Sequence, residues 1–275
     1  MPEAPAPPID LTLRAEGAGP PLLLLHGLGG DHTVWNAVVP HLKEGHSVLA
    51  PDLRGHGRSP SPAGSTYSFT ELAGDVWKTL DDRSIEKVDL VGLSAGGFLA
   101  LRLALDHPER IRRLVVIGAA AHCDNHTRAV GERWAEVYRD EGFDAYSLRL
   151  LKDLFYPDWI EAHLEVADAF RDKLRAVDLR GPIQWALSVR TFDLRGRLGR
   201  LKAPTLIIHG VDDQVVDSAH ARLLRVSIPG AELKLMPQTG HLPPVERPEA
   251  TAQAIREWIE RDTAAAAAPA GSGPR

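Results

Sequence analysis

The sequence predicts an α/β protein with a mostly parallel, twisted β-sheet flanked by helices. Short apolar runs alternate with stretches of helical periodicity along most of the 275 residues. A Gly-x-Ser-x-Gly turn, Gly92 to Gly96, follows one apolar run and opens a helical stretch. The alternation stops between residues 120 and 200, where helical patterns continue without a strand. We therefore expect one sheet-centred domain with a helical insertion.

Seven segments are predicted to be strands, because they are short apolar runs bounded by turn-forming residues. In chain order they are residues 11–14, 22–26, 47–50, 88–92, 114–117, 205–209 and 232–235. Most of them are continuously apolar and do not alternate, which is typical of parallel strands buried on both faces.

Helical patterns lie between these strands. They cover residues 35–42, 70–82, 95–106, 218–226 and 248–262. In the last of them, Ala254, Ile255, Trp258 and Ile259 recur at helical spacing, which predicts that one face packs against the sheet.

The interval 120–200 is predicted to form a helical cap over an active site, inserted into a core made of residues 9–119 and 201–262. Its helical pieces lie around 134–139, 146–154, 159–176 and 183–189, and it holds 10 of the 16 aromatic residues. Such rings fill the insertion's own small core or line a pocket. Trp35 lies outside the interval, and packing against the sheet is its simpler interpretation. The candidate substrate-binding residues are Trp35, Trp134, Tyr138, Trp159 and Trp185.

Composition excludes several classes of protein. The formal net charge of -5 and the absence of a Lys/Arg run argue against partners such as nucleic acid or an anionic membrane surface. The single cysteine, Cys123, permits neither an intrachain disulfide nor a cysteine metal cluster. No signal peptide or membrane-length apolar run is present, so we expect a cytoplasmic enzyme without a metal. The Pro/Ala-rich residues 1–8 and the low-complexity residues 264–275 are predicted to be disordered tails.

The turn at Ser94 predicts a nucleophile. A serine hydroxyl needs a base to take its proton and an acid to orient that base. His241 follows the last predicted strand, where a loop reaches the carboxyl edge of the sheet, and it is the candidate base. The adjacent aspartates Asp212 and Asp213 follow the strand 205–209 and supply the candidate acid. The order serine, aspartate, histidine is the one that this architecture requires.

Four blocks carry a resemblance to the α/β-hydrolase fold superfamily, over residues 9–262: residues 26–30, 52–59, 92–96, and the segments around Asp213 and His241. The chain looks most like small, cofactor-free serine esterases and lactonases, and is similar to enol-lactonases and perhydrolase-like esterases. In that family the acid follows Gly-x-x-Asp, which favours Asp213 over Asp212. Some members carry the acid after an earlier strand, but residues 118–121 here read Gly-Ala-Ala-Ala.

The resemblance implies that the backbone N–H groups of Leu28 and Ala95 form the oxyanion hole. His26 is expected to brace that loop by a hydrogen bond. The expected function is hydrolysis of a small, largely apolar ester or lactone through Ser94, His241 and Asp213, with no cofactor. Two alternatives stay open on the same fold: a C–C bond hydrolase acting on a vinylogous diketone, and a non-hydrolytic lyase or cyclase. A binding protein with vestigial turnover is disfavoured by the intact triad.

Overall fold

The structure is a computed structural model that describes residues 6–261. Its centre is a seven-stranded sheet in the order β1-β3-β2-β4-β5-β6-β7, in which only β1 runs antiparallel to its neighbour. The strands are β1 (Leu13–Glu16), β2 (Pro21–Leu25), β3 (Ser47–Pro51), β4 (Val88–Leu93), β5 (Ile111–Ile117), β6 (Thr205–Gly210) and β7 (Glu232–Met236). The strand order switches at β2, because β3 lies on one side of β2 and β4 lies on the other. Open α/β sheets bind their ligands beside such a switch, at the carboxyl ends of the strands.

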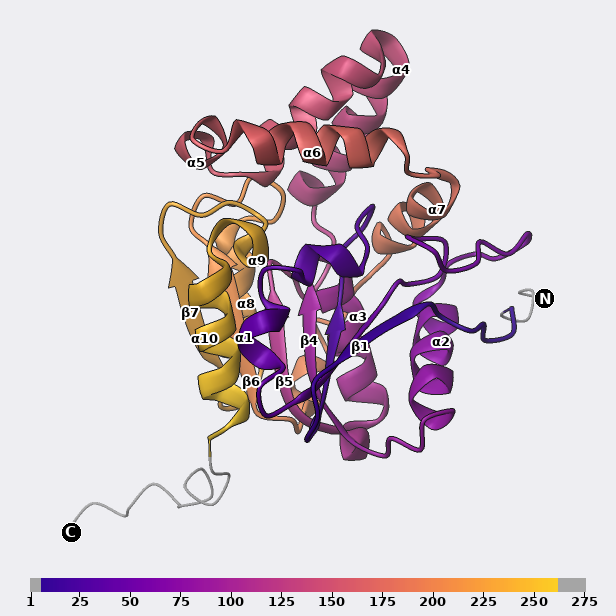
Figure 1. The fold of residues 1–275 in the computed structure, drawn as a ribbon, viewed down its shortest axis with the longest axis vertical. Helices are drawn as coiled ribbons and strands as arrows, with labels where there is room; N and C mark the ends of the chain where they lie inside the picture. Colours follow the sequence, from indigo (N-terminus) through magenta and orange to yellow (C-terminus); the bar gives the residue numbers. More distant parts are fainter. Residues whose placement is uncertain (1–5, 262–275) are drawn as a thin grey trace.

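Helices cover both faces of the sheet and give it two apolar cores (Figure 1). One core lies under η1, α1 and α10, and includes Trp35 and Trp258. The other lies under α2, α3 and α8, and includes Phe98 and Leu224. The bounds of these elements are η1 (His32–Trp35), α1 (Val39–Leu42), α2 (Phe69–Asp81), α3 (Ala95–Asp106), α8 (Ser218–Ser227) and α10 (Pro248–Ile259).

Four helices between β5 and β6 gather beyond one edge of the sheet (Figure 1). They are α4 (Asn125–Leu154), α5 (Pro157–Glu161), α6 (Leu164–Arg175) and α7 (Arg180–Val189). We call this group the cap. Gly142 has a φ of 84° inside α4, so the helix is kinked into two parts there. Three short elements complete the chain: η2 (Pro108–Arg110), η3 (Leu198–Arg200) and α9 (Pro243–Glu246).

The predicted fold class is confirmed, and all seven predicted strands overlap an observed strand. Several helix boundaries were wrong. The predicted helix 35–42 is split into η1 and α1, and the predicted helix 159–176 is broken between α5 and α6 at residues 162 and 163. The short helix α9 was not predicted.

The terminal segments are only partly described. Of residues 1–8, predicted to be disordered, residues 6–8 instead lie against α2 and its surroundings: the Ala6 N–H donates to Glu71, and the Pro7 carbonyl accepts from Arg54. Residues 1–5 and 264–275 lie outside the described range. Among the described helices, none has both the length and the apolar character needed to cross a membrane.

Candidate active site

Ser94 lies at the turn between β4 and α3, in a backbone conformation that side chains rarely adopt. Its φ is 54° and its ψ is -124°. The strand and helix approach so closely that a Cβ on Gly92 would lie 2.3 Å from the Gly96 carbonyl oxygen. A Cβ on Gly96 would lie 2.3 Å from the His26 carbonyl oxygen. Small residues on both sides of the serine are therefore required to hold its hydroxyl at the tip of the turn.

Ser94, His241 and Asp213 form one hydrogen-bonded chain, although they come from three distant segments. The Ser94 hydroxyl lies 2.8 Å from Nε2 of His241, and Nδ1 of His241 lies 2.7 Å from Oδ2 of Asp213. His241 and Asp213 are buried, whereas Ser94 is partly accessible. The structure thus brings together the predicted nucleophile, base and acid, and Asp212 is not part of this chain.

The loop after β6 holds Asp213 as an anion with one oxygen free for the histidine. Its Oδ1 accepts hydrogen bonds from the N–H groups of Val215 at 2.8 Å and Val216 at 2.9 Å. Burial would raise the pKa of Asp213, but the neighbouring His241 and His209 and the Val216 N–H outweigh it and lower that pKa. A lowered pKa keeps the carboxylate charged, as needed to stabilise a protonated His241.

The two predicted oxyanion donors lie beside the serine. Leu28 follows β2, and Ala95 is the first residue of α3, so its N–H lies at the positive end of the helix dipole. Among the described residues, neither N–H has a hydrogen-bond acceptor. The loop approaches the nucleophile closely, because a Cβ on Gly27 would lie 2.9 Å from the Ser94 Cβ. Two unpaired N–H groups beside a serine suit a developing oxyanion.

His26 braces this loop, as expected. Its Nε2 accepts from the Leu53 N–H at 2.9 Å, so Nδ1 carries the proton and donates to the Gly27 carbonyl at 2.8 Å. Burial lowers the pKa of His26, which keeps the ring neutral. The loop after β3, which contains Leu53, is held in turn by a buried ion pair of Arg54 with Asp75 of α2, at 2.7 Å. These residues are structural.

Known proteins resemble this chain along most of its length. The alpha/beta hydrolase fold family matches residues 20–248. The chain belongs to this family. A 2-hydroxymuconate semialdehyde hydrolase from Pseudomonas sp. strain CF600 is 31% identical, over 94% of this chain and 93% of the relative. A putative carbamate hydrolase from Variovorax paradoxus is 29% identical, over 94% and 98%. The solved enol-lactonase from Burkholderia xenovorans is 29% identical, covers 91% of this chain and 96% of its own, and superposes with a TM-score of 0.83.

These findings confirm the predicted family and support the prediction that the chain is a hydrolase. The relatives act on different bonds by name, so the bond that this α/β-hydrolase cleaves is treated below as a proposal.

Three of the candidate aromatic residues of the cap are buried or partly buried, in two different apolar clusters. Trp134 and Trp185 pack against the same apolar cluster that contains Ala95. Trp159 instead lies in the cap's own small core, between Phe155 and His163.

Trp35 and Tyr138 lie outside both of these clusters. Trp35 is completely buried on the opposite face of the sheet, and Tyr138 is 44% exposed against Tyr146. The interpretation of Trp35 as sheet packing therefore fits the structure, and its assignment to substrate binding does not. Helical periodicity could not separate these rings, because it does not say which face of the cap meets the core.

The five cap arginines that could hold a substrate carboxylate already have partners. Arg149 pairs with Asp153 at 2.8 Å, and Arg190 pairs with Glu132 at 2.8 Å. The remaining three pair with aspartates of the cap: Arg171 and Arg175 with Asp144, and Arg180 with Asp178.

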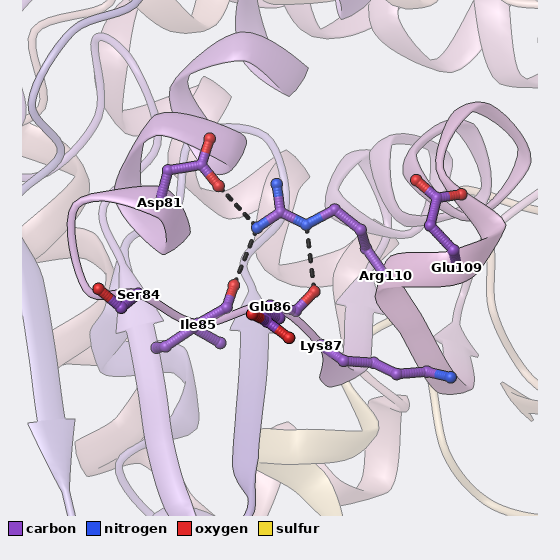
Figure 2. Close-up of a pocket in the computed structure, with 7 residues that line it drawn as sticks. All are labelled: Asp81, Ser84, Ile85, Glu86, Lys87, Glu109 and Arg110. Atoms are coloured by element: carbon purple, nitrogen blue, oxygen red, sulfur yellow. Dashed lines mark hydrogen bonds and ion pairs between the residues drawn. The ribbon is translucent and has the colours of Figure 1, made fainter.

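Figure 2 shows a pocket, which is lined by Asp81, Ser84, Ile85, Glu86, Lys87, Glu109 and Arg110. Its lining precedes β4 and β5, so it opens at the amino edge of the sheet, whereas Ser94 follows β4 at the carboxyl edge. Arg110 crosses it and contacts Asp81 and the carbonyls of Ile85 and Glu86. The side chains that line it include no serine–histidine pair, so it is not a second active site.

Within residues 6–261, one group of side chains has the spacing of metal ligands. Oxygen and nitrogen atoms of Asp31, His32 and Asp52 lie within 4.8 Å of one another. Asp31 pairs with Lys173 at 2.6 Å, and His32 pairs with Asp52 at 2.7 Å. Each of the three side chains is therefore already paired within the protein.

Two buried residues around the triad were not singled out from the sequence. His209 donates from Nε2 to the Val216 carbonyl at 2.8 Å and lies 3.4 Å from Asp213, so it holds the acid loop. Glu246 accepts three backbone N–H groups around His241. The sequence offered two signals for them: His209 lies four residues before the acid, and Glu246 lies five residues after the base.

Proposed function

We propose that this chain is a serine hydrolase that cleaves a carboxylic ester or lactone of a small, largely apolar substrate. The observation that carries the proposal is the continuous hydrogen-bonded chain from Ser94 through His241 to Asp213 beside two unpaired N–H groups. An activated hydroxyl next to an oxyanion hole is the arrangement needed for acyl transfer.

The first half of the reaction forms an acyl-enzyme. The Ser94 Oγ attacks the acyl carbonyl carbon while His241 Nε2 takes its proton, and Asp213 stabilises the resulting imidazolium. The N–H groups of Leu28 and Ala95 donate to the oxyanion of the tetrahedral intermediate. When the intermediate collapses, the C–O bond breaks and the leaving alkoxide takes the proton from His241.

The second half releases the acid. Water attacks the carbonyl carbon of the acyl-enzyme and gives a proton to His241, and the same two N–H groups hold the second oxyanion. Collapse breaks the bond to Ser94, whose Oγ recovers the proton. His241 therefore serves as the base in both halves of the reaction.

The environment of the serine favours an uncharged acyl group. Trp134, Trp185 and Val130 of the cap belong to or pack on the apolar cluster that contains Ala95. The five cap arginines considered from the sequence are each paired with a protein carboxylate. Breaking such a pair to bind a carboxylate would exchange one ion pair for another with little net gain.

C–C bond hydrolysis is the second candidate, and one observation favours it. The relative that is 31% identical over 94% of this chain is named a 2-hydroxymuconate semialdehyde hydrolase. A carbamate is a third substrate class, by the name of another relative. All three substrates present a carbonyl carbon to Ser94, so the triad alone does not separate them.

The decisive experiment compares wild type with Ser94→Ala on three substrate panels. The panels are p-nitrophenyl esters from acetate to octanoate together with small lactones, a vinylogous 1,5-diketone, and an aryl carbamate. Ester or lactone turnover that disappears in Ser94→Ala supports the proposal, and the preferred chain length measures the space under the cap. If the enzyme turns over the diketone but no ester or lactone, the proposal is refuted and C–C hydrolysis becomes the function.

A further inference from the structure

The Glu246 carboxylate is buried, with 3% of the residue exposed, and no cationic side chain pairs with it among the described residues. Backbone N–H groups surround it instead. Oε1 and Oε2 both lie 3.0 Å from the Gly240 N, Oε1 lies 3.3 Å from the Leu242 N, and Oε2 lies 2.8 Å from the Tyr156 N. Burying an anion costs free energy unless hydrogen bonds replace its lost hydration. The bonds from these N–H groups offset part of the desolvation cost of the Glu246 carboxylate.

These donors come from two parts of the molecule. Gly240 and Leu242 flank His241 in the chain, whereas Tyr156 lies 90 residues from Glu246, where the cap passes from α4 to α5. A second bond joins the same two segments, because the His241 N–H donates to the Leu154 carbonyl at 2.8 Å. The backbone of the histidine is therefore held between its own loop and the cap.

Ordinary helix capping does not account for this arrangement. Leu242 is the N-cap residue of α9, and its 3.3 Å contact with Glu246 is the longest of the set. The shorter contacts reach Gly240, outside the helix, and Tyr156, in the cap. A carboxylate that served only the helix would not need to be buried against a segment so distant in sequence.

We propose that Glu246 is a positioning residue that sets the orientation of His241 and couples it to the seating of the cap at Tyr156. The inference rests on the proposed function of His241 as the base. Because a displacement of about 1 Å in a catalytic group costs on the order of 100-fold in rate, even a small shift of the 240–242 backbone slows acylation.

Substitutions at Tyr156 remove the contact with Glu246 from the cap side. Its φ of -65° is that of proline, and Phe155 before it has φ -115° and ψ 152°, which a following proline accepts. Tyr156→Pro keeps these backbone angles and removes the N–H that Glu246 binds, but its Cδ takes the place of the amide hydrogen and pushes the Glu246 carboxylate away. Tyr156→Ala removes the same side chain and keeps the N–H, so the ratio of the two variants measures the loss of the whole contact between Glu246 and the cap.

Glu246→Gln perturbs the same network from the other side. The amide offers one acceptor, so its NH₂ must face the N–H of either Tyr156 or Leu242, and one bond is lost. Glu249→Gln makes the same chemical change three residues later, on an exposed side chain of α10, and is the matched control.

The experiment measures kcat and KM on the preferred ester, the rate of Ser94 labelling by a fluorophosphonate, and hydrogen exchange at the cap segment 154–156. We expect kcat and labelling to fall roughly 10- to 100-fold in Glu246→Gln, with KM within about threefold and values for Glu249→Gln equal to wild type. Tyr156→Pro should be slower than Tyr156→Ala, and combining it with Glu246→Gln should add less than the product of the single effects.

Three results would overturn the proposal: labelling of Glu246→Gln at the wild-type rate, a change confined to KM, or equal rates for Tyr156→Pro and Tyr156→Ala. If Glu246→Gln does not fold, Glu246→Asp takes its place. Failure of that variant to fold as well would make the carboxylate a folding determinant and refute the positioning role. Absence of labelling in wild type would instead contradict the proposed function, so the two failures are distinguishable.

Discussion

Replacing Asp213 with asparagine tests the triad most sharply, because the structure dictates how the new amide must lie. Oδ1 of Asp213 accepts two N–H groups, from Val215 and Val216. The asparagine oxygen must therefore take that position, since an NH₂ there would face two donors. The NH₂ then replaces Oδ2 and donates to Nδ1 of His241, which moves the imidazole proton to Nε2. A base already protonated at Nε2 cannot accept the Ser94 proton.

The expected loss follows from this change of tautomer. In a serine protease triad the same substitution lowers kcat about 10⁴-fold, and we expect 10³- to 10⁴-fold here. That range corresponds to about 4–5.5 kcal/mol of activation free energy. The assay is kcat for p-nitrophenyl ester hydrolysis at pH 8, with the melting temperature measured on the same samples to confirm that both proteins are folded.

Asp212→Asn is the matched control, because it makes the same change one residue away and Asp212 makes no contact with His241. We expect its kcat to stay within about twofold of wild type, as for most surface substitutions. The reasoning is refuted if Asp213→Asn keeps more than a tenth of the activity, or if Asp212→Asn is the variant that loses it.

Three further predictions concern the turn, the oxyanion loop and the cap. Ser94→Gly should be more stable than Ser94→Ala by about 1 kcal/mol in chemical denaturation, because glycine relieves the strain of φ 54°; equal stabilities would mean that the turn stores no strain. Gly27→Ala should lower kcat about 100-fold, because its Cβ would lie 2.9 Å from the Ser94 Cβ, and unchanged kcat would show that the loop yields freely. Burial would raise the pKa of Asp31, but Lys173 and Thr33 lower it from 3.8 to about 2. The stabilisation by this carboxylate is therefore complete above about pH 4 and lost as the pH falls through about 2. Asp31→Asn should reduce the free energy of unfolding at pH 7 but not at pH 2. An equal reduction at both pH values would refute the ion pair as the source of the stabilisation.

The strands were predictable because parallel strands buried on both faces have continuous apolar sequences. The start of β5 was missed, since Arg112 and Arg113 interrupt its apolar run although both lie in the strand. Helix breaks were less visible. The break at residues 162 and 163 was not predicted, because the apolar spacing continues across it, whereas the kink at Gly142 coincides with a gap between two predicted helices.

The triad was predictable because each member follows a strand at the same edge of the sheet, and the family pattern orders them along the chain. Glu246 and His209 were not, because their roles depend on backbone atoms brought close by folding. The Tyr156 N–H and the Val216 carbonyl have no sequence signature. The cap aromatics show the same limit: composition predicted a ring-rich cap, but only packing separates Trp134 from rings that face solvent.

The contacts of the cap with the core suggest that substrate selection and catalysis are not independent in this hydrolase. Lys173 of α6 binds Asp31, which directly follows the oxyanion loop. Trp185 of α7 packs edge-on against His56, 5.3 Å between ring centroids, and Tyr156 donates to the carboxylate beside the base. Each contact reaches a loop that carries or braces a catalytic group, so a shift of the cap reaches the oxyanion loop and the histidine together. Cap variants selected for longer acyl chains should therefore change kcat as well as KM, whereas a cap that only shapes the pocket would change KM alone.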